Sequence, residues 1–229
     1  MKRIIVGSAV LAIIALAVFL WLKPGQAPLS QAPEATKSAP PQAGAQGTAV
    51  RASTSGAGLP EMAMGSADAP LTIIEYASLT CPHCAAFQRD TVPELKKEYI
   101  DTGLVRWVYR DFPLDSLALA AAMLARCSGP ERYFGFVEVL FRSQSSWANS
   151  DNPRLELARI ARLANMPEET FEACLKDSSL LKGIQAGAEE AKNKYAIDST
   201  PTFIVGDRKL PGAVPFKDFK EIIDVALKK

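Results

Sequence analysis

The chain has 229 residues, enough for one domain of ordinary size with appendages. It is 48% hydrophobic and 22% charged, as in soluble globular proteins, and its formal net charge of +1 offers no field that would attract nucleic acid. Four cysteines are too few for a disulfide-scaffolded miniprotein, and a single histidine, His83, leaves most zinc sites without ligands. We therefore expect a globular protein with no nucleic-acid partner, no metal and no cofactor.

An apolar segment over residues 4–22 follows a short basic start that contains Lys2 and Arg3. As a helix it would rise about 28 Å, close to the ~30 Å hydrocarbon core of a bilayer. A proline directly after the candidate cleavage alanine favours an uncleaved anchor over residues 1–23, with a cleaved signal peptide as the alternative. Either one exports the chain. We expect a periplasmic or otherwise extracytoplasmic protein, held in the inner membrane by this helix.

Residues 24–58 form the next segment, which contains five prolines, five glycines and nine alanines but no aromatic residue. Such a stretch cannot bury enough apolar surface to offset its ordering entropy. It is therefore predicted to be a disordered tether between the membrane helix and a globular domain over residues 59–229.

The globular part shows a clear succession of elements. The β-branched run 71–77 predicts a buried strand, 82–99 a helix with a kink at Pro93, and the alternation 105–110 a second strand. Residues 115–198 are predicted to be a block of helices, 202–210 a short hairpin, and 216–227 an amphipathic helix. This order predicts an α/β, thioredoxin-like fold with a helical insertion at about 115–198.

The sequence Cys81-Pro82-His83-Cys84 lies where the first strand ends and the first helix begins. Pro82 fits the first helical position, which makes Cys81 the N-cap, beside unpaired N–H groups and the positive end of the helix dipole. His83 can add a second stabilising group. We expect Cys81 to be exposed with a lowered pKa, and Cys84 to lie one turn inward, shielded and less acidic.

A redox pair is the favoured interpretation of Cys81 and Cys84. Half of a zinc site would need a second C-x-x-C or further histidines, and the sequence has neither. A merely structural disulfide and a copper-handling module, with Met62 and Met64 as soft ligands, remain as alternatives. A stabilised thiolate favours the reduced form and makes the disulfide a stronger oxidant.

With these motifs in place, residues 64–112 and 199–227 resemble the DsbA-like branch of the thioredoxin superfamily. The members of this branch are exported bacterial dithiol oxidases. The dipeptide inside the motif is the one typical of DsbA. Glu75 stands six residues before Cys81, where the family places a buried acid, and Thr200-Pro201 is similar to its cis-proline dipeptide, which holds the substrate peptide.

The resemblance implies an enzyme that introduces disulfide bonds into reduced client proteins of the envelope and is reoxidised by a membrane partner. Threonine before the proline also occurs in disulfide isomerases, so an isomerase or reductase on the same scaffold stays open. An isomerase usually has a dimerisation segment, which residues 24–58 do not resemble. We therefore expect a monomer.

The residues themselves support two of these assignments. Glu75 interrupts an apolar strand, where desolvation would raise its pKa and suit it to exchange a proton with Cys84; an outward-facing surface residue is the alternative. Pro201 precedes an apolar strand. Because proline has no backbone N–H to donate to a neighbouring strand, it fits the start of a strand. A plain trans turn is the other possibility there.

Cys127 and Cys174 are the remaining two cysteines. In an oxidising compartment, an even number of cysteines favours a structural disulfide between them, within the helical insertion. The alternative is two buried free thiols.

Overall fold

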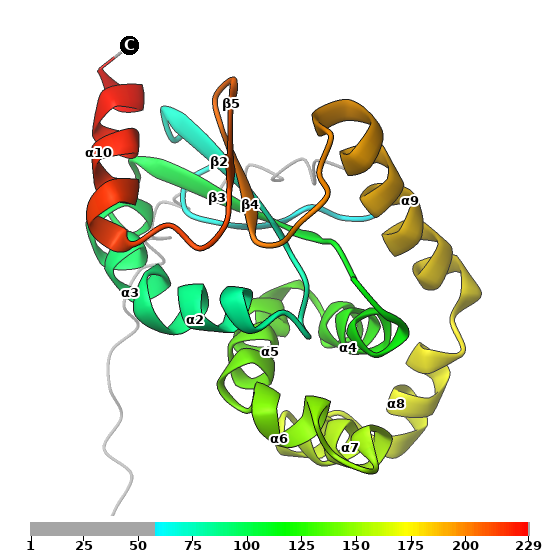
Figure 1. Ribbon diagram of the computed structural model, residues 1–229. Helices are drawn as coiled ribbons and strands as arrows, with labels where there is room; N and C mark the ends of the chain where they lie inside the picture. Colours follow the sequence, from blue (N-terminus) through cyan, green and yellow to red (C-terminus); the bar gives the residue numbers. More distant parts are fainter. Residues whose placement is uncertain (1–57, 229) are drawn as a thin grey trace, which may run out of the picture. The chain divides into compact units, whose positions relative to one another are not determined.

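The computed structural model describes residues 58–228 (Figure 1). The expected membrane anchor over residues 1–23, with its span at 4–22, and nearly all of the tether lie outside the described residues. Between residues 58 and 228, no helix is long and apolar enough to cross a membrane.

A five-stranded mixed sheet forms the centre of the domain. Its strands are β1 (Met62–Met64), β2 (Leu71–Ala77), β3 (Val105–Asp111), β4 (Thr202–Val205) and β5 (Arg208–Pro211), in the order β1-β3-β2-β4-β5. β2 and β3 are parallel, with Glu75 opposite Tyr109, and the other pairs are antiparallel. The parallel pair needs a crossover, which the first helices provide.

The helices are α2 (Pro82–Asp90), α3 (Val92–Leu95), the π-helical turn η1 (Lys96–Ile100), α4 (Ser116–Cys127), α5 (Pro130–Arg142), α6 (Gln144–Ala148), α7 (Pro153–Leu163), α8 (Glu168–Leu175), α9 (Ser178–Tyr195) and α10 (Phe216–Leu227). Helices α2, α3 and α10 cover one face of the sheet, and α9 covers the other (Figure 1). Helices α4 to α8 gather beyond the end of β3 as the insertion. The predicted thioredoxin-like α/β fold with a helical block is confirmed.

Two details differ from the sequence prediction or sharpen it. β1 could not be recognised from the sequence, because three residues are too few to show a period. The strand is defined by its antiparallel pairing with Trp107 to Tyr109. The kink expected at Pro93 is a full break. Helix α2 ends at Asp90, and Pro93 stands in the first turn of α3, where its missing N–H leaves no bond unmade.

An aromatic cluster fixes α2 on the sheet. Phe87 of α2, Trp107 of β3, Phe203 of β4 and Phe219 of α10 are each no more than 2% exposed. The ring centroid of Phe87 lies 4.6 Å from that of Phe203 and 6.0 Å from that of Trp107, distances at which aromatic pairs attract. Because these rings are buried against one another, they fix the distance of α2 from the sheet and its rotation about its own axis. They therefore also fix the position of its N-terminus.

The helical insertion is joined to the sheet by a buried ion pair. Arg126 of α4 donates through Nε to Asp111 Oδ2 at 2.5 Å, and the Tyr133 hydroxyl of α5 donates to Asp111 Oδ1 at 3.0 Å. Asp111 ends β3, so one carboxylate ties two insertion helices to the end of the strand. Both charged partners are nearly buried, which strengthens their attraction and makes loss of either one costly.

A disulfide closes the insertion on itself. The sulfurs of Cys127, at the end of α4, and Cys174, in α8, are 2.09 Å apart, and the two residues are 47 positions apart in sequence. In the chain-entropy account, closing a loop of this length stabilises the fold by about 4 kcal/mol.

We predict that Cys127→Ala with Cys174→Ala will lower the free energy of unfolding by about 4 kcal/mol, because the unfolded chain regains the entropy of the open loop. Urea unfolding without added reductant measures the change, with Cys81 and Cys84 in the same redox state in parent and variant. Cys81→Ser with Cys84→Ser is the matched control, since it removes two thiols but keeps this disulfide. Recovery of freely alkylated Cys127 and Cys174 from the unfolded, unreduced protein would contradict the assignment.

Candidate functional site

Cys81 is the N-cap of α2, at the junction of the strand β2 and the helix. Its backbone is extended, with φ −77° and ψ 118°, and its Sγ accepts a hydrogen bond from the Cys84 N–H at 3.4 Å. Pro82 stands in the first helical turn. The Cys81 thiol also lies 3.2 Å from the Thr200 carbonyl oxygen, to which it can donate. The sulfur therefore faces the helix N-terminus on one side and the proline turn on the other.

The two cysteines are free thiols and differ less in exposure than the sequence suggested. Cys81 was expected to be exposed, but only 6% of it is accessible, against 0% for Cys84. The prediction was wrong because it considered only the helix terminus. The Thr200–Pro201 turn and the helical insertion pack over that terminus and leave Cys81 only slightly more open than Cys84. His83 is exposed beside them.

The two thiols have opposite acidities. A hydrogen bond from the Cys84 thiol lowers the pKa of Cys81 to about 5, helped by a polar contact with Thr200 and by the N–H groups of His83 and Cys84, against the effect of burial. Burial raises the pKa of Cys84 well above its ordinary value, and the charges on Cys81 and Glu75 raise it further. At neutral pH the pair therefore holds one thiolate, on Cys81, and one proton, on Cys84.

Glu75 is fully buried beneath this pair. Its Oε2 accepts hydrogen bonds from Trp107 Nε1 at 3.2 Å and from Gln88 Nε2 at 3.4 Å, whereas Oε1 has no hydrogen-bond partner among residues 58–228. Burial raises the pKa of Glu75 to about 8, and the Trp107 hydrogen bond offsets part of that rise. The alternative of an outward-facing surface residue is therefore wrong, and Glu75 can hold a proton at neutral pH.

The Thr200–Pro201 peptide bond is cis and lies between α9 and β4. The alternative of a plain trans turn is thus not what the structure contains. Pro201 is buried, and its carbonyl accepts a hydrogen bond from Gly212 N–H at 2.8 Å. The Thr200 hydroxyl is buried and has no hydrogen-bond partner in the described part of the chain. The turn thus presents Thr200 to the Cys81 sulfur.

Three side chains at the site were not recognised as functional from the sequence. Trp107 lies in the alternating stretch 105–110 and is a core aromatic, but its ring nitrogen also donates to Glu75. Its strand spacing could have suggested this, because Trp107 pairs with Ile73, two residues before Glu75 on the same face. Gln88 and Gln144 carry no comparable sequence signal. Gln144 belongs to the helical insertion, yet it contacts the motif.

Cys127 and Cys174 do not join this site, since they bond to each other inside the insertion. In residues 58–228, no three His, Cys, Asp or Glu side chains form a group that could hold a metal ion. A soft metal bound by Cys81 and Cys84 would therefore need a ligand of another kind, such as a methionine sulfur.

Comparisons with known proteins agree with this geometry. The thioredoxin family model matches residues 58–225. The structure of α-DsbA1 from Wolbachia pipientis is 37% identical, with a TM-score of 0.68, over 73% of this chain and 91% of that one. Disulfide bond formation protein D of Bacillus subtilis is 27% identical over 174 residues, 72% of this chain and 76% of the relative.

A protein of Rickettsia felis, named as a still unproven protein-disulfide oxidoreductase, is 35% identical over 146 residues. The match takes in 63% of this chain and 52% of the relative, so the chain spans about half the length of the Rickettsia proteins that it matches. A dithiol at a helix N-terminus, beside a cis-proline on a five-stranded sheet, defines the thioredoxin class. Within that class, the chain belongs to the DsbA-like branch of the superfamily.

We predict that Glu75→Gln will remove a pH dependence of stability. In the folded parent Glu75 keeps its proton up to about pH 8, whereas the unfolded chain loses it near 4.5. Stability should therefore fall as the pH rises between these values, by up to about 1.4 kcal/mol per pH unit, and glutamine should abolish that slope.

Urea unfolding of the reduced protein at several pH values between about 5 and about 8 measures the difference between parent and variant. Comparison within one redox state cancels the titration of Cys81. Glu94→Gln, on the exposed surface of α3, is the control and should run parallel to the parent. Equal slopes for the parent and Glu75→Gln would mean that Glu75 titrates as a surface residue does.

Proposed function

We propose that this chain is an exported dithiol oxidase, an enzyme that passes the Cys81–Cys84 disulfide to reduced client proteins. One observation carries the proposal: the Cys81 thiolate is strongly stabilised while its partner thiol is not. With a pKa near 5 instead of 9, the thiolate favours the reduced form at pH 7 on the order of 100-fold, which corresponds to about 60 mV. Because the reduced form of the site is favoured, its disulfide is a strong oxidant of client thiols.

The reaction proceeds through two successive thiol–disulfide exchange steps. A client thiolate attacks Cys81 Sγ in the oxidised site, the bond between Cys81 and Cys84 breaks, and Cys84 leaves as a thiolate. The second client thiolate then attacks the client sulfur of the mixed disulfide and releases the Cys81 thiolate. Two electrons pass from the client to the enzyme, and the client keeps the disulfide. The stabilised leaving group drives the second step forward.

Glu75 supplies the proton that the first step requires. The departing Cys84 sulfur is buried and strongly disfavours a negative charge. Glu75 is protonated at neutral pH and less basic than that thiolate, so the proton moves from Glu75 to Cys84. Reoxidation returns it by the reverse path.

The Thr200–Pro201 turn provides the place for the client chain. It stands directly against the Cys81 sulfur, through the Thr200 carbonyl at 3.2 Å. An extended client segment laid along this turn would bring its cysteine to the accessible side of Cys81. His83 is exposed next to that position and can contribute a hydrogen bond to the client.

The proposed setting is the cell envelope. An uncleaved helix over residues 4–22 would hold the enzyme at the inner membrane, residues 24–58 would serve as its tether, and a membrane protein would accept the two electrons. The relatives from Bacillus subtilis and Wolbachia pipientis, named for disulfide bond formation and as a DsbA, support this setting. An isomerase or reductase on the same scaffold is the alternative, and the reduction potential distinguishes an oxidase from a reductase.

We expect the Cys81–Cys84 couple to have a reduction potential well above the about −270 mV of thioredoxin and toward the about −120 mV of DsbA. The physical reason is the stabilised Cys81 thiolate. Equilibration with glutathione buffers and alkylation of the remaining thiols measures it. Tenfold changes in the equilibrium constant correspond to about 30 mV, so the outcomes separate well. A potential at or below that of thioredoxin would make the chain a reductase and overturn the oxidase assignment.

The assignment of roles to the two sulfurs predicts a trapping pattern. Cys84→Ser should accumulate mixed disulfides between Cys81 and client proteins, because the second enzyme thiol is absent. Cys81→Ser should form few or none, because Cys84 is fully buried. Non-reducing gels of cell extracts, repeated with reductant, show the larger species and their loss. The reverse pattern would exchange the proposed roles of the two sulfurs.

A further inference from the structure

Gln144 reaches the redox motif from the helical insertion. It is the first residue of α6, it is 9% exposed, and its Nε2 donates to the Leu79 carbonyl at 2.8 Å and to the Cys81 carbonyl at 3.0 Å. Both distances are those of ordinary N–H···O hydrogen bonds. Since a glutamine amide has two N–H hydrogens, this arrangement uses one on Leu79, just before the motif, and the other on Cys81, its first residue.

The two carbonyls that Gln144 binds define where α2 begins. The Leu79 carbonyl belongs to the short connection between β2 and α2. The Cys81 carbonyl also accepts the Ala85 N–H at 3.1 Å, which is the first hydrogen bond of the helix. Gln144 therefore holds both ends of the segment that carries the Cys81 side chain, and this segment orients Sγ toward the N–H of Cys84.

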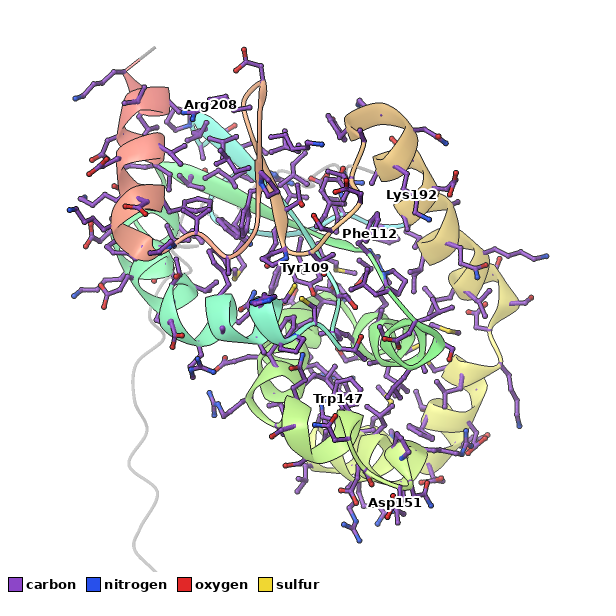
Figure 2. All side chains as sticks on the ribbon, in the orientation of Figure 1. Tyr109, Phe112, Trp147, Asp151, Lys192 and Arg208 are labelled. Atoms are coloured by element: carbon purple, nitrogen blue, oxygen red, sulfur yellow. A yellow bond between two sulfur atoms is a disulfide. The ribbon has the colours of Figure 1, made fainter. Side chains whose placement is uncertain are left out.

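Helix α6 is a rigid support for that amide. Trp147, one turn further along, is fully buried, and its ring nitrogen donates to the Leu140 carbonyl at 2.8 Å. Figure 2 shows Trp147 among the helices of the insertion, apart from Tyr109 of the sheet. Because this indole fixes α6 on α5, the Gln144 side chain is held in place by the insertion and not by the motif.

The amide also has an electrostatic effect on the sulfur. Carbonyl oxygens carry partial negative charge, and those of Leu79 and Cys81 stand within the segment that bears the thiolate. Two N–H hydrogens on these oxygens offset that charge, and in a buried site this compensation is only weakly screened. Removing the amide leaves two buried carbonyls with fewer partners and a less favourable field for the thiolate.

We propose that Gln144 is a positioning residue, through which the helical insertion holds Cys81 in the geometry that stabilises its thiolate. The proposal rests on Cys81 being the exchanging thiolate of the proposed function. It gives the insertion a direct part in setting the redox equilibrium of the site. The contact joins residues 63 positions apart in sequence, so it exists only while the insertion is docked on the motif.

Gln144→Leu tests the proposal, because leucine has a similar size and no amide. The fraction of Cys81–Cys84 disulfide at fixed glutathione ratios should shift so that the oxidising equilibrium constant falls about tenfold, or about 30 mV. The Cys81 thiolate, followed by its ultraviolet absorbance and by the pH dependence of its alkylation, should titrate about one pH unit higher. Gln144→Met, which also keeps the length, serves if the leucine variant does not fold.

The control is Ser145→Ala, the next residue of α6, whose side chain is exposed. It should leave both readouts unchanged. The ionisable groups around Cys81, namely His83, Cys84, Glu75 and, through Thr80, Asp115, are the same in every variant. Any shift in the titration then reports the lost amide contact.

A purely structural role for Gln144 gives a different result. It would lower the free energy of unfolding of the oxidised and reduced proteins equally, with the potential and the Cys81 titration unchanged, and this outcome overturns the proposal. The comparison is between variant and parent. It therefore remains decisive if the parent has the potential of a reductase, a result that would reject the proposed oxidase function alone.

Discussion

The hydrogen bonds that converge on the Cys81 sulfur are the interaction on which the site depends. The N–H and the thiol of Cys84 stabilise negative charge at a place where burial opposes it. This works only because the N-terminus of α2 points at the sulfur. Phe87, packed in the aromatic cluster between sheet and helix, keeps it there. The core thus determines the acidity of a thiol at its edge.

The buried acid is the second constraint, and it opposes stability. Burial destabilises the charged carboxylate by more than the hydrogen bonds from Trp107 and Gln88 stabilise it, so Glu75 remains protonated to about pH 8. The same burial makes Glu75 a proton donor matched to Cys84, whose thiolate is still less tolerable. One physical effect, desolvation, therefore sets the direction of proton movement between the two groups.

The helical insertion contributes more than a cover for the sheet. Its own loop is closed by the Cys127–Cys174 disulfide, and its docking on β3 depends on the carboxylate of Asp111. From this fixed base, Gln144 reaches the main chain of the motif. Stability and chemistry are thereby linked, since whatever loosens the insertion also changes the surroundings of the Cys81 sulfur.

The sequence by itself determined the local features: the strand ending at the motif, the N-cap position of Cys81, the acid six residues before it and the closing hairpin. Capping and periodicity are properties of neighbouring residues, so they can be recognised in the chain. Only the tertiary structure decided how far Cys81 is covered, which groups bind Glu75, and that β1 exists at all. These depend on contacts such as those of Thr200 with Cys81, 119 residues apart, and of Trp107 with Glu75, 32 apart, which arise only when the packed core brings distant segments together.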